Sequence, residues 1–309
     1  MIPIQLLNRT IQKISILIFC LITLHVQAQI NQHQEFVTTV LDKLYPAKMH
    51  QGKKIKSIEV ELGMKRENSR IEKSGKKYIF NYQDDGRLEL FVEVLRKEYE
   101  FDSIFTLHYY NKEAKLQIAR TYNNGKYLAI YENFDDAGRL IKSMRCQETN
   151  LTDDFRFFKI GQQTVLQSES YQYEIINDNQ VKKKFFNDQN LVYKEGILYY
   201  EGNPKMLKAQ EFAFTTTGVK VNYTYTYDEQ GRQMESNYFS NAAGEIKEST
   251  RYTYNASVLT EDKYYRNSSL KNQRFYFYGK DNGLLESILS KSGNAYLIEI
   301  YNFNFTFYQ

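Results

Sequence analysis

The sequence predicts an all-β protein, and three observations lead to this prediction. The chain contains 27 Tyr and 20 Phe but no Trp and only 3 Pro. Tyrosine packs well on a half-buried pleated surface, and scarce proline leaves the ladder hydrogen bonds of strands intact. From Lys54 onward, apolar and polar residues alternate with a period of two, as in "YTYTY" at residues 223–227. Glycine turns such as Gly231 and Gly244 follow one another at the distance of one strand plus one turn.

Residues 1–28 have the order of a secretory signal peptide. Residues 1–13 carry Arg9 and Lys13 without an acid, residues 14–26 are apolar, and the small residue Ala28 follows. The apolar run is shorter than the roughly 20 residues that a membrane-spanning helix needs. We therefore expect cleavage after Ala28, export from a bacterial cytoplasm, and no transmembrane helix in the mature chain. Lipidation of Cys20 is an alternative, although Cys20 lies inside the apolar run rather than at its end.

Residues 29–50 form the one segment that predicts a helix. Pro46 ends a pattern of apolar residues at three- and four-residue spacing, which are Phe36, Val37, Val40, Leu41 and Leu44. Residues 51–309 are the expected β-repeat domain. Between residues 150 and 210 the strand alternation continues while the turn pattern weakens, so a break between two sub-blocks within this range stays open.

A turn pattern recurs along the chain: an aromatic residue, three polar residues that include acids, and then Gly and Arg. It occurs as "YQDDGR" (82–87), "FDDAGR" (134–139) and "YDEQGR" (227–232). Asp and Asn hydrogen-bond to their own backbone, and Gly supplies the positive φ that tight turns require. The acids of this pattern are therefore expected to be turn residues rather than catalytic groups. The residues assigned to such turns are Asp85, Gly86, Asp136, Gly138, Asp228, Gly231, Gly244 and Gly283.

Two strands and two turns make a hairpin repeat of roughly 25 residues. A series of such repeats predicts an antiparallel meander that forms an open twisted sheet or a solenoid-like wrap, with one short N-terminal helix. Stacked repeats of this kind bury a thin continuous core and present extended binding surfaces.

The Y-D-x-x-G-R turn resembles the YD repeats of Rhs-type proteins, and the turns "NNGKY" (123–127) and "DAGRL" (136–140) resemble MORN-like hairpin repeats. The resemblance covers residues 78–145 and 220–295. Rhs proteins use many such repeats to build a shell around a toxin. This chain is too short for a shell and lacks a self-cleaving segment, so the resemblance implies an architecture and no toxin role. A signal peptide followed by degenerate repeats is also similar to exported repeat proteins of Bacteroidetes-type bacteria.

The sequence lacks the patterns of common catalytic and cofactor sites. It has no G-x-S-x-G elbow, P-loop or dinucleotide fingerprint. His33, His50 and His108 do not stand at metal-ligand spacing from one another or from Cys146, the one cysteine of the mature chain. No catalytic residue, metal site or cofactor is therefore expected, although a weak Ca²⁺ site in an acidic turn stays open.

The charge pattern excludes a nucleic-acid-binding face. The formal net charge of the whole chain is +4, and both signs are interspersed along it. The run of three lysines at 182–184 is short and predicts a solvated strand end. No nucleic-acid partner is expected.

Aromatic strand faces are the main functional lead. Alternation places Tyr223, Tyr225 and Tyr227 on one face of a strand, and a second row contains Tyr301, Phe303, Phe305 and Phe307. Such rows stabilise sheets as cross-strand ladders, and exposed rows form platforms for sugar rings or for the side chains of a partner. The hypothesis is an exported, non-enzymatic binding or structural repeat protein. It would interact with a protein or glycan in the periplasm, at the cell surface or outside the cell.

Two other classes of function stay open. A secreted hydrolase could use paired carboxylates such as Asp84 and Asp85, Asp135 and Asp136, or Asp153 and Asp154. An outer-membrane β-barrel would explain the aromatic C-terminal stretch "YNFNFTFYQ". Charged residues on both faces of strands such as "RQMESNYF" speak against lipid contact, because each lipid-facing charge at the midplane costs about 2–4 kcal/mol.

Overall fold

The computed structural model describes residues 37–41, 44–66, 69–96, 101–113, 115–123, 125–152, 154–242, 244–293 and 296–309. The expected signal peptide, with Cys20, and His33 lie outside these ranges. The chain divides into two compact units. The first contains Met1–Lys56, Tyr82–Arg87 and Phe307–Gln309, and the second contains Ser57–Asn81 and Leu88–Thr306.

The first unit contains the α-helical segments of the described residues. Residues 37–41 are α-helical, and a second helix, α2, spans Ala47–Gly52 directly after Pro46. The imidazole of His50 in α2 stacks on the ring of Tyr82, with 3.9 Å between the ring centroids. Among the described residues, no helix has the length and apolar character needed to span a membrane.

The β-strands follow one another along the rest of the chain. Their bounds are β1 (Ile55–Arg66), β2 (Glu72–Tyr82), β3 (Leu88–Arg96), β4 (Phe101–Tyr110), β5 (Leu116–Asn123), β6 (Lys126–Phe134), β7 (Leu140–Asn150), β8 (Ile160–Asn177), β9 (Gln180–Phe186), β10 (Val192–Glu201), β11 (Met206–Phe214), β12 (Lys220–Tyr227), β13 (Gln233–Ser240), β14 (Ile246–Asn255), β15 (Val258–Arg266), β16 (Ser269–Tyr278), β17 (Leu285–Ser292) and β18 (Leu297–Phe307). A short 3₁₀ helix, η1 (Phe155–Phe157), lies in the connection between β7 and β8.

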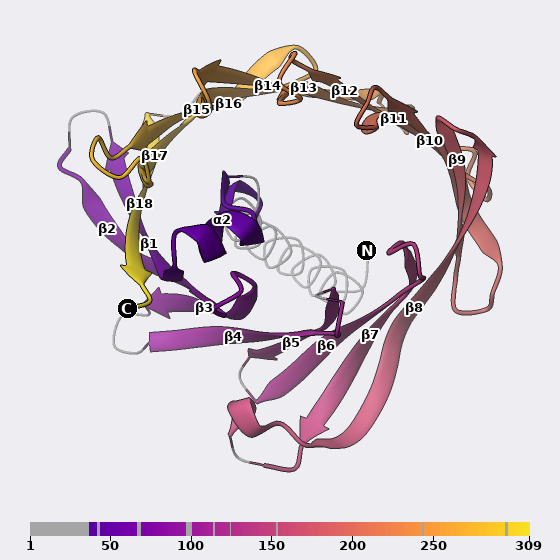
Figure 1. Ribbon diagram of the computed structural model, residues 1–309, viewed down its shortest axis with the longest axis horizontal. Coiled ribbons are helices and arrows are strands. Elements are labelled where there is room, and N and C mark those ends of the chain that lie inside the picture. Colours follow the sequence, from indigo (N-terminus) through magenta and orange to yellow (C-terminus); the bar gives the residue numbers. More distant parts are fainter. Residues whose placement is uncertain are drawn as a thin grey trace, which may run out of the picture. The chain divides into compact units, whose positions relative to one another are not determined.

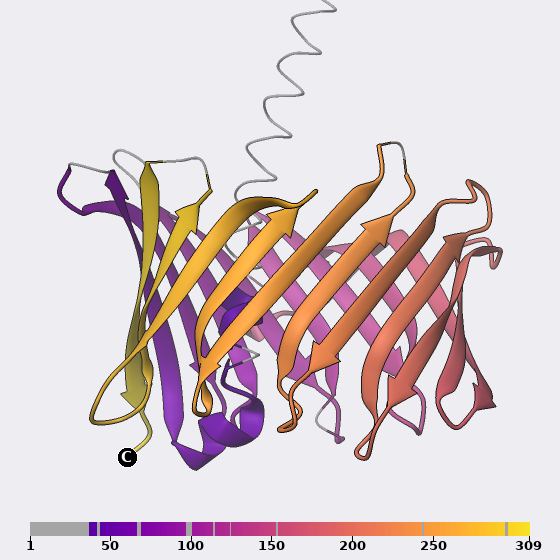
Figure 2. The same cartoon turned by 90° about the horizontal axis from the view of Figure 1, so that it is seen from above.

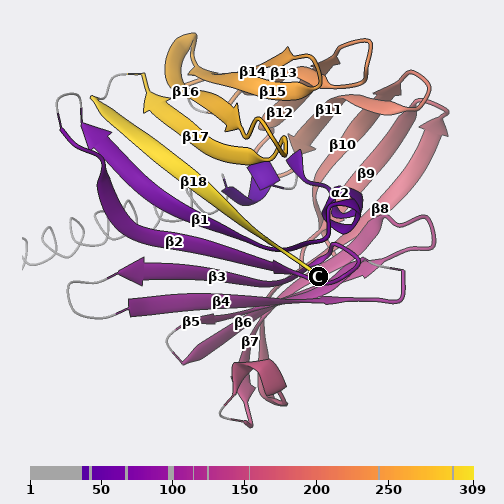
Figure 3. The same ribbon diagram turned by 60° about the vertical axis from the view of Figure 1, so that its left-hand side comes forward.

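The strands of the second unit form a closed barrel. Consecutive strands pair with each other along the chain, and β18 also pairs with β1, so that the 18-stranded sheet closes on itself. The ring of strands is visible in Figure 1, and Figure 3 shows β18 beside β1. In Figure 2 the strands are strongly inclined, as closure of a sheet into a barrel requires.

The expected open sheet or solenoid-like wrap is therefore wrong, and so is the expected YD- or MORN-like repeat protein. The hairpins are joined edge to edge in one closed sheet instead of stacking along a superhelix. The all-β antiparallel class and the meander are confirmed. Closure depends on the pairing of β1 with β18, which are far apart in the sequence. The alternation of apolar and polar residues is the same in open and closed sheets, so it could not predict this closure. The closed barrel favours the outer-membrane barrel over the binding repeat protein, which the fold does not support.

On strands β15–β18, burial distinguishes the inner from the outer face of the barrel wall. Directly paired residues of neighbouring strands lie on the same face of a sheet. By this criterion one face of β15–β18 carries the buried residues Asp262, Tyr276, Ile288 and Tyr301. Phe277, on the opposite face, is 46% exposed. Side chains converge on the concave face of a closed sheet and diverge on the convex face, so the buried set marks the inner face.

Candidate functional site

The first predicted aromatic row lies on the inner face of β12. The rings of Tyr223 and Tyr238 on β13 lie 5.1 Å apart, centroid to centroid. The Tyr225 hydroxyl accepts a hydrogen bond of 2.8 Å from Gln210 Nε2, and the Tyr227 hydroxyl donates one of 2.8 Å to the backbone oxygen of Leu207. These tyrosines line the interior of the barrel and do not form an outward platform.

The second predicted row divides along β18. Tyr301 and Phe303 are buried, and the Tyr301 hydroxyl donates to Glu299 Oε2 at 3.1 Å. Phe305 is half-buried, and Phe307 is 45% exposed and belongs to the first unit. A binding role for either row stays a prediction.

The inner face also holds a buried ion pair. Arg274 Nε on β16 donates to Asp262 Oδ1 on β15 at 2.7 Å, and the Tyr276 hydroxyl donates to the other carboxylate oxygen. Asp262 is 1% exposed. The pair satisfies the hydrogen-bonding needs of a charge that would otherwise be costly to bury.

The outward face of β9–β15 is rich in charge, and we call it the charged wall. Its charged residues are Lys182, Lys184, Glu195, Glu211, Lys220, Glu235, Lys247, Arg251, Glu261 and Lys263. Several form ion pairs, such as Lys182–Glu195 at 3.1 Å and Arg251–Glu235 at 3.0 Å. The Lys182 and Glu195 side chains are 31% and 40% exposed, so water screens this pair.

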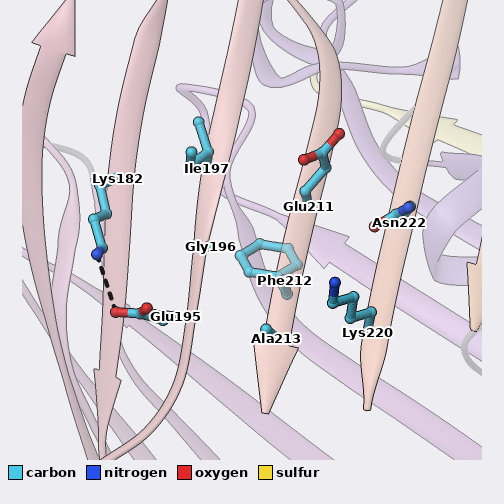
Figure 4. Close-up of a pocket in the computed structure, with 9 residues that line it drawn as sticks. All are labelled: Lys182, Glu195, Gly196, Ile197, Glu211, Phe212, Ala213, Lys220 and Asn222. Atoms are coloured by element: carbon cyan, nitrogen blue, oxygen red, sulfur yellow. Dashed lines mark ion pairs between the residues drawn. The ribbon is translucent and has the colours of Figure 1, made fainter. Parts of the chain in front are cut away.

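A depression of about 380 Å³ lies on the charged wall, between β9 and β12. Figure 4 shows the lining residues and the ion pair within it. A Cβ atom on Gly196 would collide with the carbonyl oxygen of Glu211 and with the Phe212 ring, so this position requires glycine. The lining residues are Lys182, Glu195, Gly196, Ile197, Glu211, Phe212, Ala213, Lys220 and Asn222.

The outward face of β3–β7 is different, and we call it the apolar wall. It carries Leu90, Val92, Phe105, Leu107, Ile118, Tyr122, Ala129, Tyr131 and Met144. Among the described side chains, three charged residues lie on it: Arg120, Glu148 and the exposed Lys142 near the start of β7. Arg120 Nε donates to Glu148 Oε2 at 2.7 Å, and the two side chains are only 7% and 0% exposed.

Aromatic side chains of the β7–β8 connection cover this ion pair. The guanidinium carbon of Arg120 lies 3.9 Å from the centroid of the Phe158 ring. Phe155 stacks on Phe105 at 4.6 Å, between ring centroids. Gln163 Nε2 and the Tyr131 hydroxyl donate further hydrogen bonds to Glu148. The connection therefore packs on the outward face of β4–β7 and covers the Arg120–Glu148 ion pair.

The predicted turn residues occupy turns between strands. Asp228 Oδ1 accepts hydrogen bonds from the backbone N–H groups of Gln230 and Arg232, at 3.0 and 2.9 Å, and Arg232 Nε donates to its Oδ2 at 2.7 Å. The hydrogen bond and charge of Arg232 hold the pKa of Asp228 below its usual range. In the β6–β7 turn, Asp135 makes the corresponding bonds to Arg139, whereas the sequence pointed to Asp136. The other assigned turn residues are Asp85, which bonds Arg87, and Gly86, Gly138, Gly231, Gly244 and Gly283, which have positive φ.

The histidines and the cysteine of the described residues are separate from one another. His50 is 2% exposed, and burial lowers its pKa to about 4. His108 lies on the inner face of β4, opposite Ala119, and Cys146 is a buried free thiol. Within the described ranges, no three His, Cys, Asp or Glu side chains are grouped so that they could hold a metal ion.

Sequence reasoning missed Arg120 and Glu148, which belong to different strands and carry no local signal of pairing. Their contact follows from the register of β5, β6 and β7, in which Ala129 lies between Arg120 and Cys146. Alternation along β5 and β7 could have placed both residues on one face, but could not have brought them together.

Comparisons with known proteins give distant structural similarity. No protein-family model matches the chain, and no curated protein sequence matches it. A porin-like protein from Bacteroides uniformis is similar at 12% identity and a TM-score of 0.39, over 82% of this chain and 97% of that one. A porin-like protein from Bacteroides vulgatus is similar at 11% identity and a TM-score of 0.29, over 70% of this chain and 97% of that one. A LolA superfamily protein from Nitrosomonas europaea reaches 10% identity and a TM-score of 0.20, over 86% and 90% of the two chains. These similarities are too distant to carry an inference of function.

Proposed function

We propose that the protein is an exported β-barrel of the bacterial outer envelope, seated at the outer membrane. The observation that carries this proposal is the closure of the 18-stranded antiparallel sheet. Closure leaves no sheet edge, and every strand finds hydrogen-bonding partners on both sides. An even number of antiparallel strands in a closed meander is the architecture of bacterial outer-membrane barrels.

The apolar wall supports contact with lipid on one side of the barrel. Its outward residues, such as Leu90, Leu107 and Ile118, suit a hydrocarbon environment. The Arg120–Glu148 pair would not face lipid directly, because both side chains are buried. Shielding of this kind avoids the cost of about 2–4 kcal/mol for a lipid-facing charge at the midplane.

The charged wall limits lipid contact to part of the circumference. Glu195, Glu211 and Arg251 lie well inside their strands, where a membrane-spanning barrel would meet the hydrocarbon core. We therefore propose that this side faces water or a protein neighbour. The aromatic and ionic interior would then form the wall of a conduit or container for small solutes.

A second candidate function is a barrel that is free in the periplasm. The charged wall favours it, because exposed ion pairs such as Lys182–Glu195 are typical of a surface in water. On this alternative, the apolar wall would be covered by a protein partner or by a second copy of the chain.

Fractionation of the native host distinguishes the two candidates. Envelopes are separated by density, and the outer-membrane fraction is washed first with salt and then with alkaline carbonate. We expect the protein in the outer-membrane fraction, resistant to both washes and extracted by detergent. Recovery in the osmotic-shock fluid, without detergent, would contradict the membrane proposal and support the periplasmic barrel.

A further inference from the structure

The closed ring has no first or last strand, but β8 leaves one stretch of unpaired sheet edge at its end. β8 is 18 residues long, whereas β9 has 7 residues. The pairing with β9 covers only residues 170–177 of β8. Residues 160–169 have β7 beside them on one side, and no described strand pairs with their other side. The first part of β8 therefore runs past the end of β9 with one edge free.

This free edge lies at the surface of the protein. Every residue from 160 to 167 is exposed. The exposed residues include three large apolar ones, which are Ile160 at 46%, Val165 at 52% and Leu166 at 51%. An exposed strand edge with apolar side chains is a template on which a strand of another chain can pair.

Most of the devices that protect a strand edge are absent from this stretch. Residues 160–168 contain no charged residue and no proline. Two β-bulges are present, because the pairing with β7 shifts register between Arg145 and Cys146 and again between Glu148 and Asn150. Bulges bend a strand, so the edge is regular in the run between them, which is residues 163–165. Thr164 is the middle residue of this regular run.

Opposite charges bound the neutral stretch. Lys159 precedes it and is exposed, and Glu169 follows it. Among the described residues, neither side chain forms an ion pair. Glu169 accepts hydrogen bonds from the hydroxyls of Tyr171 and Tyr193, and these bonds leave its negative charge in place. Thr164 lies midway between the two charges in the sequence. Two copies that pair antiparallel about Thr164 would therefore bring Lys159 of each copy opposite Glu169 of the other.

We infer that the free edge of β8 pairs with the same edge of a second copy of the chain, with a two-fold axis at Thr164. Antiparallel pairing is the geometry that β8 already has with β7 and β9, and it would give the free backbone groups hydrogen-bonding partners. The neutral residues meet without repulsion between like charges, and an ion pair at each end sets the direction and the register. A charged strand of another protein would find no opposite charge between residues 160 and 168.

Cross-linking of the purified mature protein, kept in detergent, tests this inference. Thr164→Cys places a thiol at the two-fold axis, where a short bis-maleimide can join the two copies. Thr224→Cys is the matched control, because Thr224 is an exposed threonine of β12, which pairs with strands on both sides. The parent, whose Cys146 is buried, gives the background. We expect a covalent dimer of Thr164→Cys alone, and a protein mass of two chains for the parent in sedimentation equilibrium.

Charge variants test the register of the pairing. Thr164→Lys places two like charges opposite each other and should weaken the dimer about tenfold. Thr224→Lys adds the same charge away from the edge and should leave the dimer affinity unchanged within about twofold. Lys159→Glu opposes Glu169 with a like charge and should weaken the dimer about fivefold, whereas Lys159→Arg should retain it. Circular dichroism checks that every variant keeps the fold of the parent.

Four results would overturn the inference. They are a mass of one chain at every concentration, equal cross-linking of Thr164→Cys and Thr224→Cys, a dimer that Thr164→Lys does not weaken, and cross-linking of Thr164→Cys in native envelopes to a different protein. The last result would assign the edge of β8 to that protein. The free edge does not depend on where the barrel is located, so membrane fractionation can fail while the dimer is found, and the two proposals are separately testable.

Discussion

The apolar wall and the charged wall are built from the same kind of strand but have different outer chemistry. Both alternate with a period of two, and both contain ion pairs between neighbouring or nearby strands. On the apolar wall the pair Arg120–Glu148 is buried under Phe158, whereas on the charged wall Lys182 and Glu195 are 31% and 40% exposed. The exposure of a charge on the outward face therefore depends on whether a connection packs over it.

The largest expected effect comes from breaking the buried pair. Glu148→Gln leaves the Arg120 charge buried without its carboxylate and should lower the free energy of unfolding by about 3–5 kcal/mol. Glu195→Gln, its counterpart on the charged wall, should cost about 0–1 kcal/mol because water screens that pair. Urea unfolding followed by tyrosine fluorescence measures both. Equal losses would show that the two walls do not differ in the burial of charge.

A smaller effect is expected from uncovering the buried pair. Phe158→Ala removes the ring that lies 3.9 Å from the guanidinium carbon of Arg120. We expect a loss of about 2 kcal/mol from the packing and cation–π contacts. Phe157→Ala is the matched control, since Phe157 is 73% exposed and its loss should leave the unfolding midpoint unchanged. A loss at Phe157 that matches the loss at Phe158 would refute the covering role.

The smallest change in stability is expected from the turns between strands. The β6–β7 turn and the β12–β13 turn have the same hydrogen bonds between an aspartate and an arginine. Asp135 and Asp228 each have a pKa below the usual range, which their arginine partners and turn N–H groups hold down. Because the pKa of each carboxylate is lower in the folded than in the unfolded state, the carboxylate stabilises the fold at pH values above its unfolded pKa of about 4. This contribution to stability is lost as the pH falls through the folded pKa. Asp135→Asn and Asp228→Asn should therefore lower the melting temperature at pH 7 by similar, small amounts. The difference from the parent should vanish near pH 2, and a difference that persists there would contradict this account.

The helical segment of the first unit is expected to respond to acid separately from the turns. Burial lowers the pKa of His50 to about 4, so the folded state disfavours the imidazolium form. The unfolded state binds more protons between about pH 6.5 and pH 4, and stability falls as the pH drops through this window. Amide hydrogen exchange in α2 should accelerate in this range, and His50→Phe should abolish the dependence. A pH-independent exchange rate in the parent would contradict the prediction.

Local features of the sequence predicted the class and the connectivity but not the closure. The alternating residues "YTYTY" form part of β12. The turn at Asp228 has the side-chain-to-backbone hydrogen bonds that its residue types predict. The pairing of β1 with β18 cannot be predicted from the sequence of either strand, because backbone hydrogen bonds between strands do not depend on how far apart the strands are in the sequence. The open sheet and the YD- or MORN-like repeat were therefore wrong.

The candidate site was predictable in part. Alternation placed Tyr223, Tyr225 and Tyr227 together, yet it could not tell the inner face from the outer face. The lysine run at 182–184 predicted a solvated strand end, but the run lies in the middle of β9, and its first and third members form ion pairs on the outward face. The position of Lys183 against Phe185 depends on the register between β9 and β10, which the sequence does not show.

The most direct test of the two walls uses the absence of tryptophan from the chain, which makes a single introduced indole a unique probe. Leu90→Trp places it on the apolar wall and Thr224→Trp on the outward face of β12, and both proteins are reconstituted in vesicles. Quenching by brominated lipid and by iodide in water is then measured for each. We expect lipid quenching of Leu90→Trp alone and iodide quenching of Thr224→Trp. Lipid quenching of both would contradict a water-facing charged wall, and lipid quenching of neither would contradict a seat at the membrane.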